Sequence, residues 1–344
     1  MNIEFLSITK LATISVIYAV FFWYVNVSSI DGKIPVVMKN KKSTQIRSKY
    51  APHSNSDEEP KVLPDDIIYK HSRTIFVIPQ YKLIFFTFPK VACTEWKRMF
   101  MRMNGNQNWC NISDNDVHKP KINLISTLAD YSPDVATAMM TSPLWTKAAF
   151  VREPKERVLS AFLDKSLQGD LFIRRCCHSF QDIDTKNKCQ NNHGNFESFL
   201  FFVTNYPDKC FNVHWEPQIE KIDKKWWPYI DFIGYQHNLL QDSETLLRSL
   251  TSSRDLTPGH TAWEQYGASG WGDDNELCEK RSNSFLNENT SSHNLGTGSH
   301  MLEWYTPKAE KIVEENWAVE WQNEKIQYPL VKLFPNGGIK KSWE

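Results

Sequence analysis

The stretch LIFFTFPKVACTEWKRMFMRM, residues 83–103, predicts a strand, a short loop and a helix in direct succession. Residues 83–88 form a short apolar run rich in aromatic side chains, and Pro89 ends it, as is typical of a buried strand in an α/β sheet. From Thr94, which we expect to cap the helix, apolar residues recur at helical spacing. The loop at residues 90–93 therefore precedes a helix N-terminus.

A loop in this position favours the binding of an anion. The helix N-terminus presents unpaired backbone N–H groups and the positive end of the helix dipole, and Lys90 adds a full positive charge. The loop lacks the glycines of the phosphate-binding motif GxxxxGK[ST], and a lysine in such a loop is usually only solvated. This unit alone therefore leaves both interpretations open.

A second strand-to-helix unit strengthens the anion-binding interpretation. Residues 148–151 form a short strand signal that ends in Arg152, and Pro154 suits the first turn of a helix that carries Ser160. Because ligands of α/β sheets bind at the carboxyl ends of parallel strands, we expect Lys90 and Arg152 to share one crevice. Two cationic strand ends suggest a ligand with two anionic groups.

These segments resemble the cofactor motifs of the membrane-bound carbohydrate sulfotransferases, the group that modifies chondroitin, dermatan and related glycans. PKVACTEWKR at residues 89–98 is similar to their 5′-phosphosulfate loop, and FVREPKERVLSAFLDK at residues 150–165 to their 3′-phosphate segment. HWEPQ at residues 214–218, leading to YIDFIGYQHNL at residues 229–239, resembles the downstream region of the family. Glu95 departs from the family pattern, which commonly has a neutral polar residue there, and places a carboxylate near the expected anion.

The resemblance implies an α/β fold with a P-loop-like parallel sheet flanked by helices. It also implies transfer of a sulfuryl group from 3′-phosphoadenosine 5′-phosphosulfate (PAPS) to a hydroxyl of a glycan, in a scheme that requires no metal. Arg152 and Ser160 would hold the 3′-phosphate of PAPS. The phosphosulfate loop would consist of Pro89, Lys90, Val91, Ala92, Cys93 and Thr94. Lys90 would also be catalytic, because its charge would stabilise the oxygen that bridges sulfur to the leaving nucleotide.

The acceptor hydroxyl must lose a proton as it attacks, and His214 is the expected general base. It lies in FNVHWEPQ, downstream of both cofactor segments, although a histidine beside a tryptophan is more often a packed structural residue. Glu216 is an alternative if this segment is a strand, because residues i and i+2 of a strand share a face. His118, between the two cofactor segments, ranks below His214.

Two other classes of function stay open at this point. A P-loop kinase would also place a lysine on a strand-to-helix loop, but the missing glycines and the absence of a clear metal-binding carboxylate motif disfavour it. A catalytically inactive, glycan-binding membrane protein of the same fold is the second alternative, since fold does not fix activity. A nucleic-acid partner is not expected, because forty acidic and forty basic residues cancel.

The N-terminal region predicts a membrane anchor. Residues 11–30 contain no charge and are long enough to cross a bilayer, although a cleaved signal peptide is an alternative. We expect residues 1–10 to be a short cytoplasmic tail, 31–61 a flexible stem and 62–344 the sulfotransferase domain.

The expected orientation is that of a single-pass type II protein of the Golgi membrane, with the sulfotransferase domain in the lumen. The lysines and arginine that follow the span oppose this orientation under the positive-inside rule. Seven cysteines and the glycosylation sequons at Asn111 and Asn289 favour it.

The cysteines predict disulfides rather than a metal site. Six lie outside the cofactor loop, at positions 110, 176, 177, 189, 210 and 278, and their pairing is open, whereas Cys93 is expected to be unpaired. A zinc site was weighed at Cys176, Cys177, His178, Cys189 and His193. Adjacent cysteines without a CxxC pair make its spacing poor.

The remaining pattern places further elements around these motifs. Residues 73–80 predict a strand beside residues 83–88, residues 231–235 a third strand of the sheet, and residues 254–298 a substrate-facing insertion or partly disordered segment. Further helices are expected from Pro133 onward, at 195–204, at 241–250 and at 307–322.

Overall fold

The computed structural model describes residues 75–251, 260–267, 300–328 and 332–334. The predicted tail, span and stem lie outside these ranges, as do Asn289, Cys278 and most of the predicted insertion. Within the described ranges, no helix is both long enough and apolar enough to cross a membrane.

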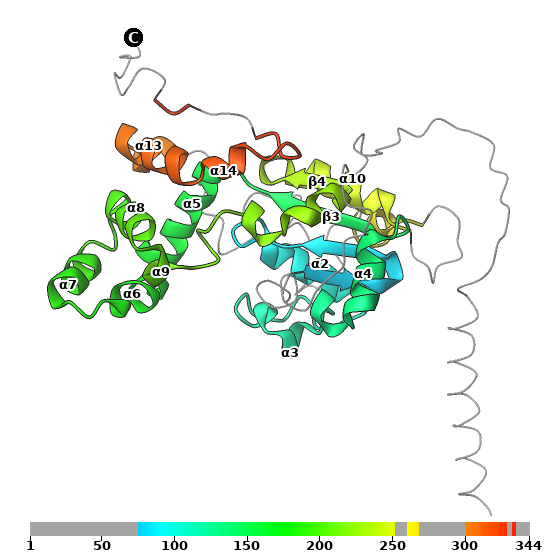
Figure 1. The fold of residues 1–344 in the computed structure, drawn as a ribbon. Helices are drawn as coiled ribbons and strands as arrows, with labels where there is room; N and C mark the ends of the chain where they lie inside the picture. Colours follow the sequence, from blue (N-terminus) through cyan, green and yellow to red (C-terminus); the bar gives the residue numbers. More distant parts are fainter. Residues whose placement is uncertain (1–74, 252–259, 268–299, 329–331, 335–344) are drawn as a thin grey trace, which may run out of the picture. The chain divides into compact units, whose positions relative to one another are not determined.

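The centre of the fold is a four-stranded sheet in the order β1-β2-β3-β4 (Figure 1). Its strands are β1 (Ile75–Ile78), β2 (Leu83–Phe86), β3 (Thr146–Val151) and β4 (Phe232–Tyr235). The strands β2, β3 and β4 are parallel, but β1 is antiparallel to β2, so the expected parallel sheet is in fact mixed. The reason is the three-residue turn Pro79–Tyr81, which is too short for a parallel crossover and makes a hairpin.

The first helix after the sheet confirms the predicted strand-loop-helix unit, with one correction. Helix α2 (Cys93–Met103) begins two residues earlier than expected, and Ala92, not Thr94, stands at its N-cap. Thr94 lies in the first turn, where its side chain cannot act as the cap. The apolar face is buried as predicted, with Trp96 tilted against Phe85 and Phe150 at ring-centroid distances of 4.6 and 4.8 Å.

Close packing across the sheet depends on one glycine. A Cβ atom at Gly234 in β4 would lie 2.4 Å from the ring of Phe150, so only glycine lets that ring pack flat against the neighbouring strand. Strand β4 therefore sits close to β3, and both reach the carboxyl edge of the sheet together.

The helices expected from the sequence begin within two residues of their predicted starts: α4 (Pro133–Thr141), α5 (Pro154–Phe162), α8 (Phe196–Asn205), α10 (Leu239–Ser249) and α13 (Pro307–Asn316). The predicted helix 307–322 is broken at Trp317 into α13 and α14 (Ala318–Trp321). The described residues also form α3 (Pro120–Asn123), α6 (Leu171–Arg175), α7 (Ile183–Asn191), α9 (Pro207–Cys210) and α12 (Met301–Trp304).

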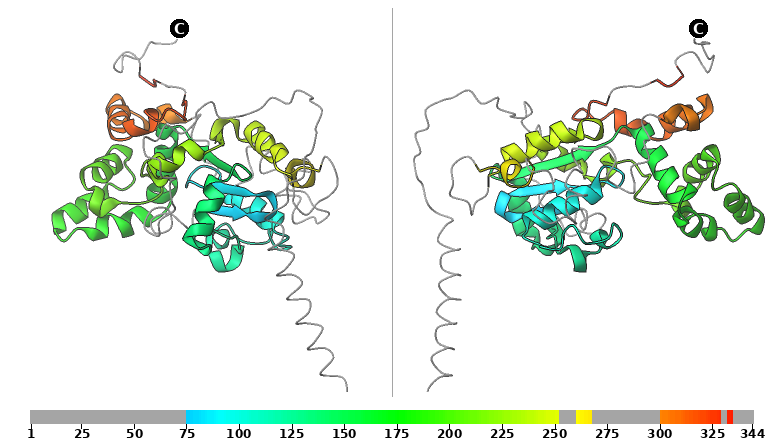
Figure 2. Two further views of the ribbon diagram at one scale, coloured as in Figure 1. Left: turned by 45° about the vertical axis from the view of Figure 1, so that its right-hand side comes forward. Right: turned by 180° about the vertical axis from the view of Figure 1, so that it is seen from behind.

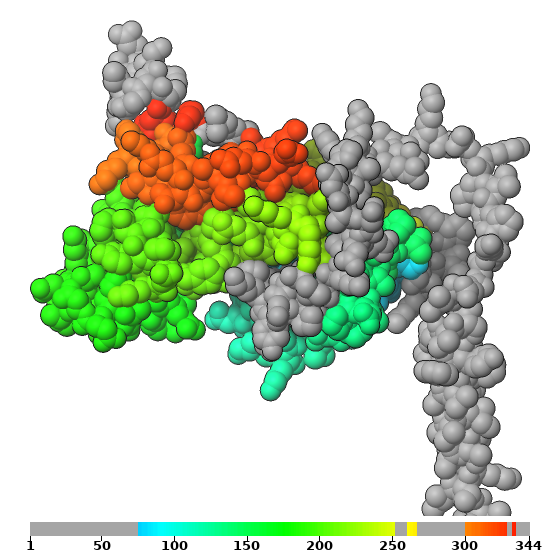
Figure 3. All heavy atoms as spheres, viewed as in Figure 1, coloured from blue at the N-terminus to red at the C-terminus, as the bar shows by residue number. Residues whose placement is uncertain are grey.

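The buried apolar residues form two clusters. One surrounds the sheet with α2 and α10, and the other joins α5 to α8 and α13, which Figure 2 shows as a group of helices beside the sheet. Helix α13 packs against α8, and the two are neighbours on the face seen in Figure 3. Helix α5 begins two residues after Arg152 and so connects the sheet to the second cluster.

Disulfides reinforce the helical cluster. Cys176 is bonded to Cys210 and Cys177 to Cys189, and Cys110 is also disulfide-bonded. The zinc alternative at residues 176–193 is therefore wrong, because disulfide sulfurs are not thiolate ligands. Cys93 is the free cysteine of the described residues, as predicted.

Candidate active site

The loop after β2 has an unusual backbone. Lys90 and Ala92 adopt left-handed conformations, with φ of 70° and 50°, which cost roughly 1–2 kcal/mol each for residues other than glycine. Turns that contain left-handed residues can direct backbone N–H groups toward an anion, and α2 begins immediately after this one. The strained loop and the helix N-terminus together make a site for an anion.

The side chain of Lys90 is buried beside a carboxylate. Its Nζ lies 2.9 Å from Oδ2 of Asp164, and Lys165 approaches the same oxygen at 2.9 Å. Burial lowers the pKa of Lys90, and the charge of Asp164 opposes this effect only in part. Burial would raise the pKa of Asp164, but the charge of Lys90 and the bonds from both lysines lower it to about 2.

Asp164 owes its position to the end of α5. Helix α5 passes without interruption into a π-helical turn, Leu163–Leu167, and the wider turn carries Asp164 and Lys165. Such turns are frequent at functional sites because they displace side chains from the ordinary helical register. The motif FVREPKERVLSAFLDK thus supplies a partner for Lys90 as well as Arg152 and Ser160.

Arg152 lies against the Lys90 loop. Its Nη1 donates a hydrogen bond of 3.2 Å to the carbonyl of Lys90, and its Nε lies 3.3 Å from Oε2 of Glu156. Its backbone is held on both sides by Gln218, whose amide accepts from the N–H of Arg152 and donates to its carbonyl at 2.9 and 2.8 Å. The two cationic strand ends therefore meet, as the parallel β2–β3 pairing requires.

The other residues expected at the cofactor site lie on the same two units. Val91, Thr94 and Ser160 are buried, and Ser160 faces the interior from α5 with 2% of its surface exposed. Pro89, Ala92 and Cys93 are half-buried in the loop and at the start of α2. Each of these residues therefore lies on the strand-to-helix unit where the sequence predicts it.

His214 lies in a turn near these cations. Its Nδ1 is 2.5 Å from Oδ1 of Asn212, which also accepts from the backbone N–H of His214. Burial lowers the pKa of His214 to about 3, and the positive charges of Lys165, Lys90 and Arg157 add to the effect. The imidazole of His214 is therefore neutral at physiological pH, and the charge of Lys90 contributes to this low pKa.

The two alternative bases, Glu216 and His118, have different surroundings from His214. Residues 213–216 form a turn rather than a strand, so the condition that would bring Glu216 beside His214 is not met. The carboxylate of Glu216 is paired with Lys221. His118 is exposed, with Nε2 3.2 Å from Oγ1 of Thr94 and Nδ1 2.5 Å from Nζ of Lys97, so it borders the loop from its outer side.

Arg157 and Gln218 are site residues that sequence reasoning missed. Arg157 on α5 binds backbone carbonyls of the Lys90 loop and of the His214 turn, and Gln218 binds Glu320 besides Arg152. A signal for Arg157 exists, since it stands among the apolar residues of α5, where a charged group must find partners. Gln218 ends the HWEPQ stretch noted in the sequence, but nothing in that stretch marks it as a partner of Arg152.

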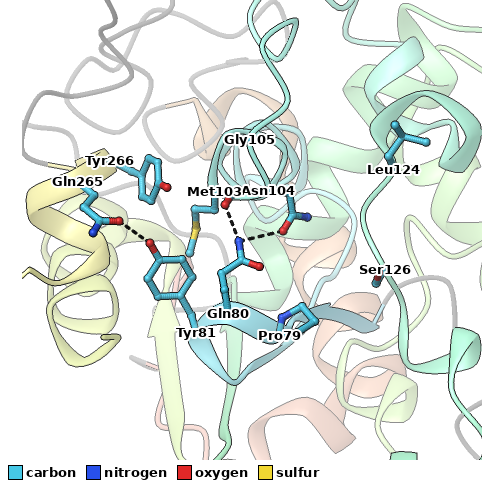
Figure 4. A pocket seen from close by; sticks show the side chains of 10 residues that line it. All are labelled: Pro79, Gln80, Tyr81, Met103, Asn104, Gly105, Leu124, Ser126, Gln265 and Tyr266. Atoms are coloured by element: carbon cyan, nitrogen blue, oxygen red, sulfur yellow. Dashed lines mark hydrogen bonds between the residues drawn. The ribbon is translucent and has the colours of Figure 1, made fainter. Parts of the chain in front are cut away.

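A separate cavity of about 620 Å³ lies at the opposite edge of the sheet (Figure 4). It borders the hairpin turn before β2 and the end of α2, whereas Lys90 follows the carboxyl end of β2. Gln80 crosses it to bind the carbonyl of Met103 at 2.5 Å, and Tyr81 binds Gln265 at 2.6 Å. No predicted site residue lines this cavity, so it is distinct from the candidate active site.

Comparison with known proteins identifies the class of enzyme to which the site belongs. The model of the sulfotransferase family matches residues 73–294, which is well over half of the chain and includes Lys90, Arg152, Ser160 and His214. The chain belongs to the sulfotransferase family.

Its relatives are carbohydrate sulfotransferases, which confirms the resemblance drawn from the motifs. It is 28% identical to carbohydrate sulfotransferase 9 of Homo sapiens over 53% of this chain and 42% of that protein. It is 33% identical to carbohydrate sulfotransferase 11 of Danio rerio over 41% and 38%, and 26% identical to carbohydrate sulfotransferase 10 of Danio rerio over 56% and 57%. The chain thus matches about half the length of these relatives. No solved structure matches it significantly.

Proposed function

We propose that this chain is a carbohydrate O-sulfotransferase that transfers the sulfuryl group of PAPS to a hydroxyl of a glycan. The observation that carries the proposal is the bond from the Arg152 guanidinium to the Lys90 carbonyl. It brings two cationic strand ends to one edge of the sheet, as a donor with anionic groups at two ends requires. Membership of the sulfotransferase family favours sulfuryl over phosphoryl transfer.

The donor would bind by exchanging carboxylate partners for its own anionic groups. Arg152 would turn its guanidinium from Glu156 to the 3′-phosphate, with the hydroxyl of Ser160 as a second donor. Backbone N–H groups at Val91, Ala92 and Cys93, with the Thr94 hydroxyl, would hold the phosphosulfate at the start of α2. Pro89 would fix the entry to this loop, since it ends the strand.

Lys90 would stabilise charge that develops during transfer. Sulfuryl transfer resembles phosphoryl transfer, in which positioning and electrostatic stabilisation supply most of the acceleration. As the bond between sulfur and the bridging oxygen breaks, negative charge grows on that oxygen, and the ammonium of Lys90 would leave Asp164 to neutralise it. The scheme contains no step for a metal ion.

His214 would take the proton of the acceptor hydroxyl. Its pKa of about 3 keeps the imidazole neutral and able to accept a proton. The same low pKa makes it a weak base until the positive charges around it are offset. Bound PAPS brings negative charge next to Lys90, and this would raise the pKa of His214 toward the range in which general bases are effective.

The membrane topology belongs to the same proposal. Residues 11–30 would anchor the chain in the Golgi membrane, with residues 62–344 in the lumen. Disulfides at Cys176–Cys210 and Cys177–Cys189 support an oxidising compartment, and Asn111 of the first sequon is exposed. Glycosidase treatment of the protein from eukaryotic cells should lower its apparent mass, and protease added outside intact microsomes should spare the domain. Complete digestion of the domain in those microsomes would refute the lumenal assignment.

Turnover with radiolabelled PAPS and a panel of glycans tests the function. We expect label to enter at least one glycan with the wild type and not with Lys90→Ala. Labelled ATP in place of PAPS is the control for a kinase. Binding of PAPS without transfer to any glycan would instead support the inactive glycan-binding protein.

A further inference from the structure

Arg157 is a buried charge whose hydrogen bonds all go to the backbone of two distant segments. Its side chain is fully buried, with 0% of its surface exposed. Nε donates to the carbonyl of Pro89 at 3.1 Å, while Nη1 and Nη2 donate to the carbonyls of Glu216 and Val213 at 2.6 and 3.0 Å. A charge buried at this cost is kept only where such partners compensate for its lost hydration.

The three carbonyls flank the two candidate catalytic side chains. Pro89 immediately precedes Lys90 in the chain, and Val213 and Glu216 stand on either side of His214. A guanidinium is planar and carries its donors in fixed directions, so two segments that bind one guanidinium are held at a fixed spacing. The Lys90 loop and the His214 turn lie more than a hundred residues apart in the sequence, and α5 stands between them in the chain.

Arg157 differs in this respect from Arg152, which stands five residues earlier. Arg152 forms an ion pair with the partly exposed Glu156, so it has a carboxylate partner that an anion can replace. Arg157 is engaged through Nε, Nη1 and Nη2 with carbonyl groups, and the buried carboxylate of Glu320 acts on its charge. The guanidinium nitrogens of Arg157 therefore bind the protein itself and not a ligand.

We propose that Arg157 is a positioning residue that fixes the His214 turn against the Lys90 loop. The proposal rests on the proposed sulfotransferase function, because it concerns the alignment of the acceptor's base with the reacting end of the donor. A misplacement of about 1 Å in such an alignment is enough to reduce a rate ~10²-fold. Arg157 touches neither reactant and acts only through the two backbone segments.

The test compares Arg157→Lys with Arg98→Lys. Lysine keeps the charge of Arg157 but has no fork that can bind both segments at once. Arg98 on α2 is a matched control, because it is 2% exposed and binds the carbonyls of Trp109 and Ile112 at 2.9 and 2.7 Å, together with Asp114. These partners lie outside the Lys90 loop and the His214 turn.

Three quantities are measured for each variant: the melting temperature, the affinity for 3′-phosphoadenosine 5′-phosphate, and single-turnover transfer at saturating PAPS. Both variants should melt at lower temperature. Only Arg157→Lys should lose transfer by ~10²-fold while its nucleotide affinity falls far less. Equal losses of rate and affinity in Arg157→Lys, or a rate as high as that of Arg98→Lys, would overturn the proposal.

Amide hydrogen exchange separates this inference from the function on which it rests. In Arg157→Lys, exchange should rise at residues 89–93 and 211–217 but not across the fold, whereas Arg98→Lys should leave both segments unchanged. If the wild type transfers no sulfate, the function fails, and exchange still decides whether Arg157 joins the segments. If Arg157→Lys does not fold, the wild type supplies the test. Addition of 3′-phosphoadenosine 5′-phosphate must then slow amide exchange at residues 211–217. A wild type without that response would contradict the inference.

Discussion

Lys90 and Arg152 both follow the carboxyl end of a strand and both pair with a carboxylate, yet their backbones are held differently. Lys90 occupies a left-handed conformation, and its ammonium is buried. Arg152 is instead held through its backbone N–H and carbonyl by Gln218. The strained loop fits our proposal that Lys90 changes its partner during the reaction. The clamped backbone fits our proposal that Arg152 anchors a phosphate.

The largest effect should come from removing the cation of the strained loop. Lys90→Ala is expected to lower turnover by ~10²- to 10³-fold, because it deletes a charge that is needed most in the transition state. Rates at saturating PAPS measure the loss. Lys165→Ala is the matched control, since it removes the other lysine on Asp164 but leaves the loop intact, and it should lose much less. Equal losses in the two variants would mean that only the local charge matters.

Removal of the proposed base should come next. His214→Ala is expected to lower turnover by ~10²-fold at saturating PAPS, with PAPS affinity and melting temperature unchanged. His118→Ala is the companion variant, because His118 borders the loop through Thr94 but stands on its exposed side. If His118→Ala shows the larger fall in turnover, the base is His118. A His214→Ala protein that unfolds would identify His214 as a structural residue.

Arg152→Ala should affect binding rather than chemistry. Loss of a charge-assisted hydrogen bond to the 3′-phosphate is expected to weaken PAPS binding by about tenfold or more. Turnover at saturating PAPS should fall less than in Lys90→Ala, because the 3′-phosphate is remote from the breaking bond. Calorimetry with the nucleotide gives the affinity, and an unchanged value would refute the assignment of Arg152 to the 3′-phosphate.

The smallest effect concerns Asp164 and appears as a shift with pH. The charge of Asp164 raises the pKa of Lys90 against the effect of burial, so Asp164→Asn should lower that pKa further. Because the protonated lysine is the active form, the alkaline limb of kcat/KM against pH should move to lower pH. Turnover below this limb should change only a few-fold. A limb that stays in place would show that Lys90 is not the group that titrates there.

The local elements of the fold were predictable, because each depends on periodicity and end signals within a few residues. The strand predicted at 83–88 is confirmed over residues 83–86, as are the buried face of α2 and the helices that start at Pro133 and Pro154. The expected cap at Thr94 was wrong because the helix starts after a left-handed alanine, which carries no side-chain signal. The predicted strand at 73–80 beside 83–88 is confirmed as β1, and its tight hairpin turn makes it antiparallel, so only the expectation of a purely parallel sheet was wrong.

The site was predictable only where one motif supplies several residues. Arg152 and Ser160 lie on one continuous segment, and parallel strands bring that segment to Lys90. The partners of Arg157 and Gln218 could not be predicted, because these contacts join residues about 60 positions apart. The alternative at Glu216 depended on a strand, and the turn at 213–216 is held from outside the segment.

The disulfide Cys176–Cys210 makes the position of the His214 turn depend on the redox state of the surroundings. Cys210 stands four residues before His214, and its carbonyl accepts a 2.9 Å hydrogen bond from the indole of Trp215. The Lys90 loop and Arg152 are held without a disulfide of their own, through Arg157, Gln218 and the sheet. Reduction of this disulfide should therefore loosen the His214 turn more than the Lys90 loop.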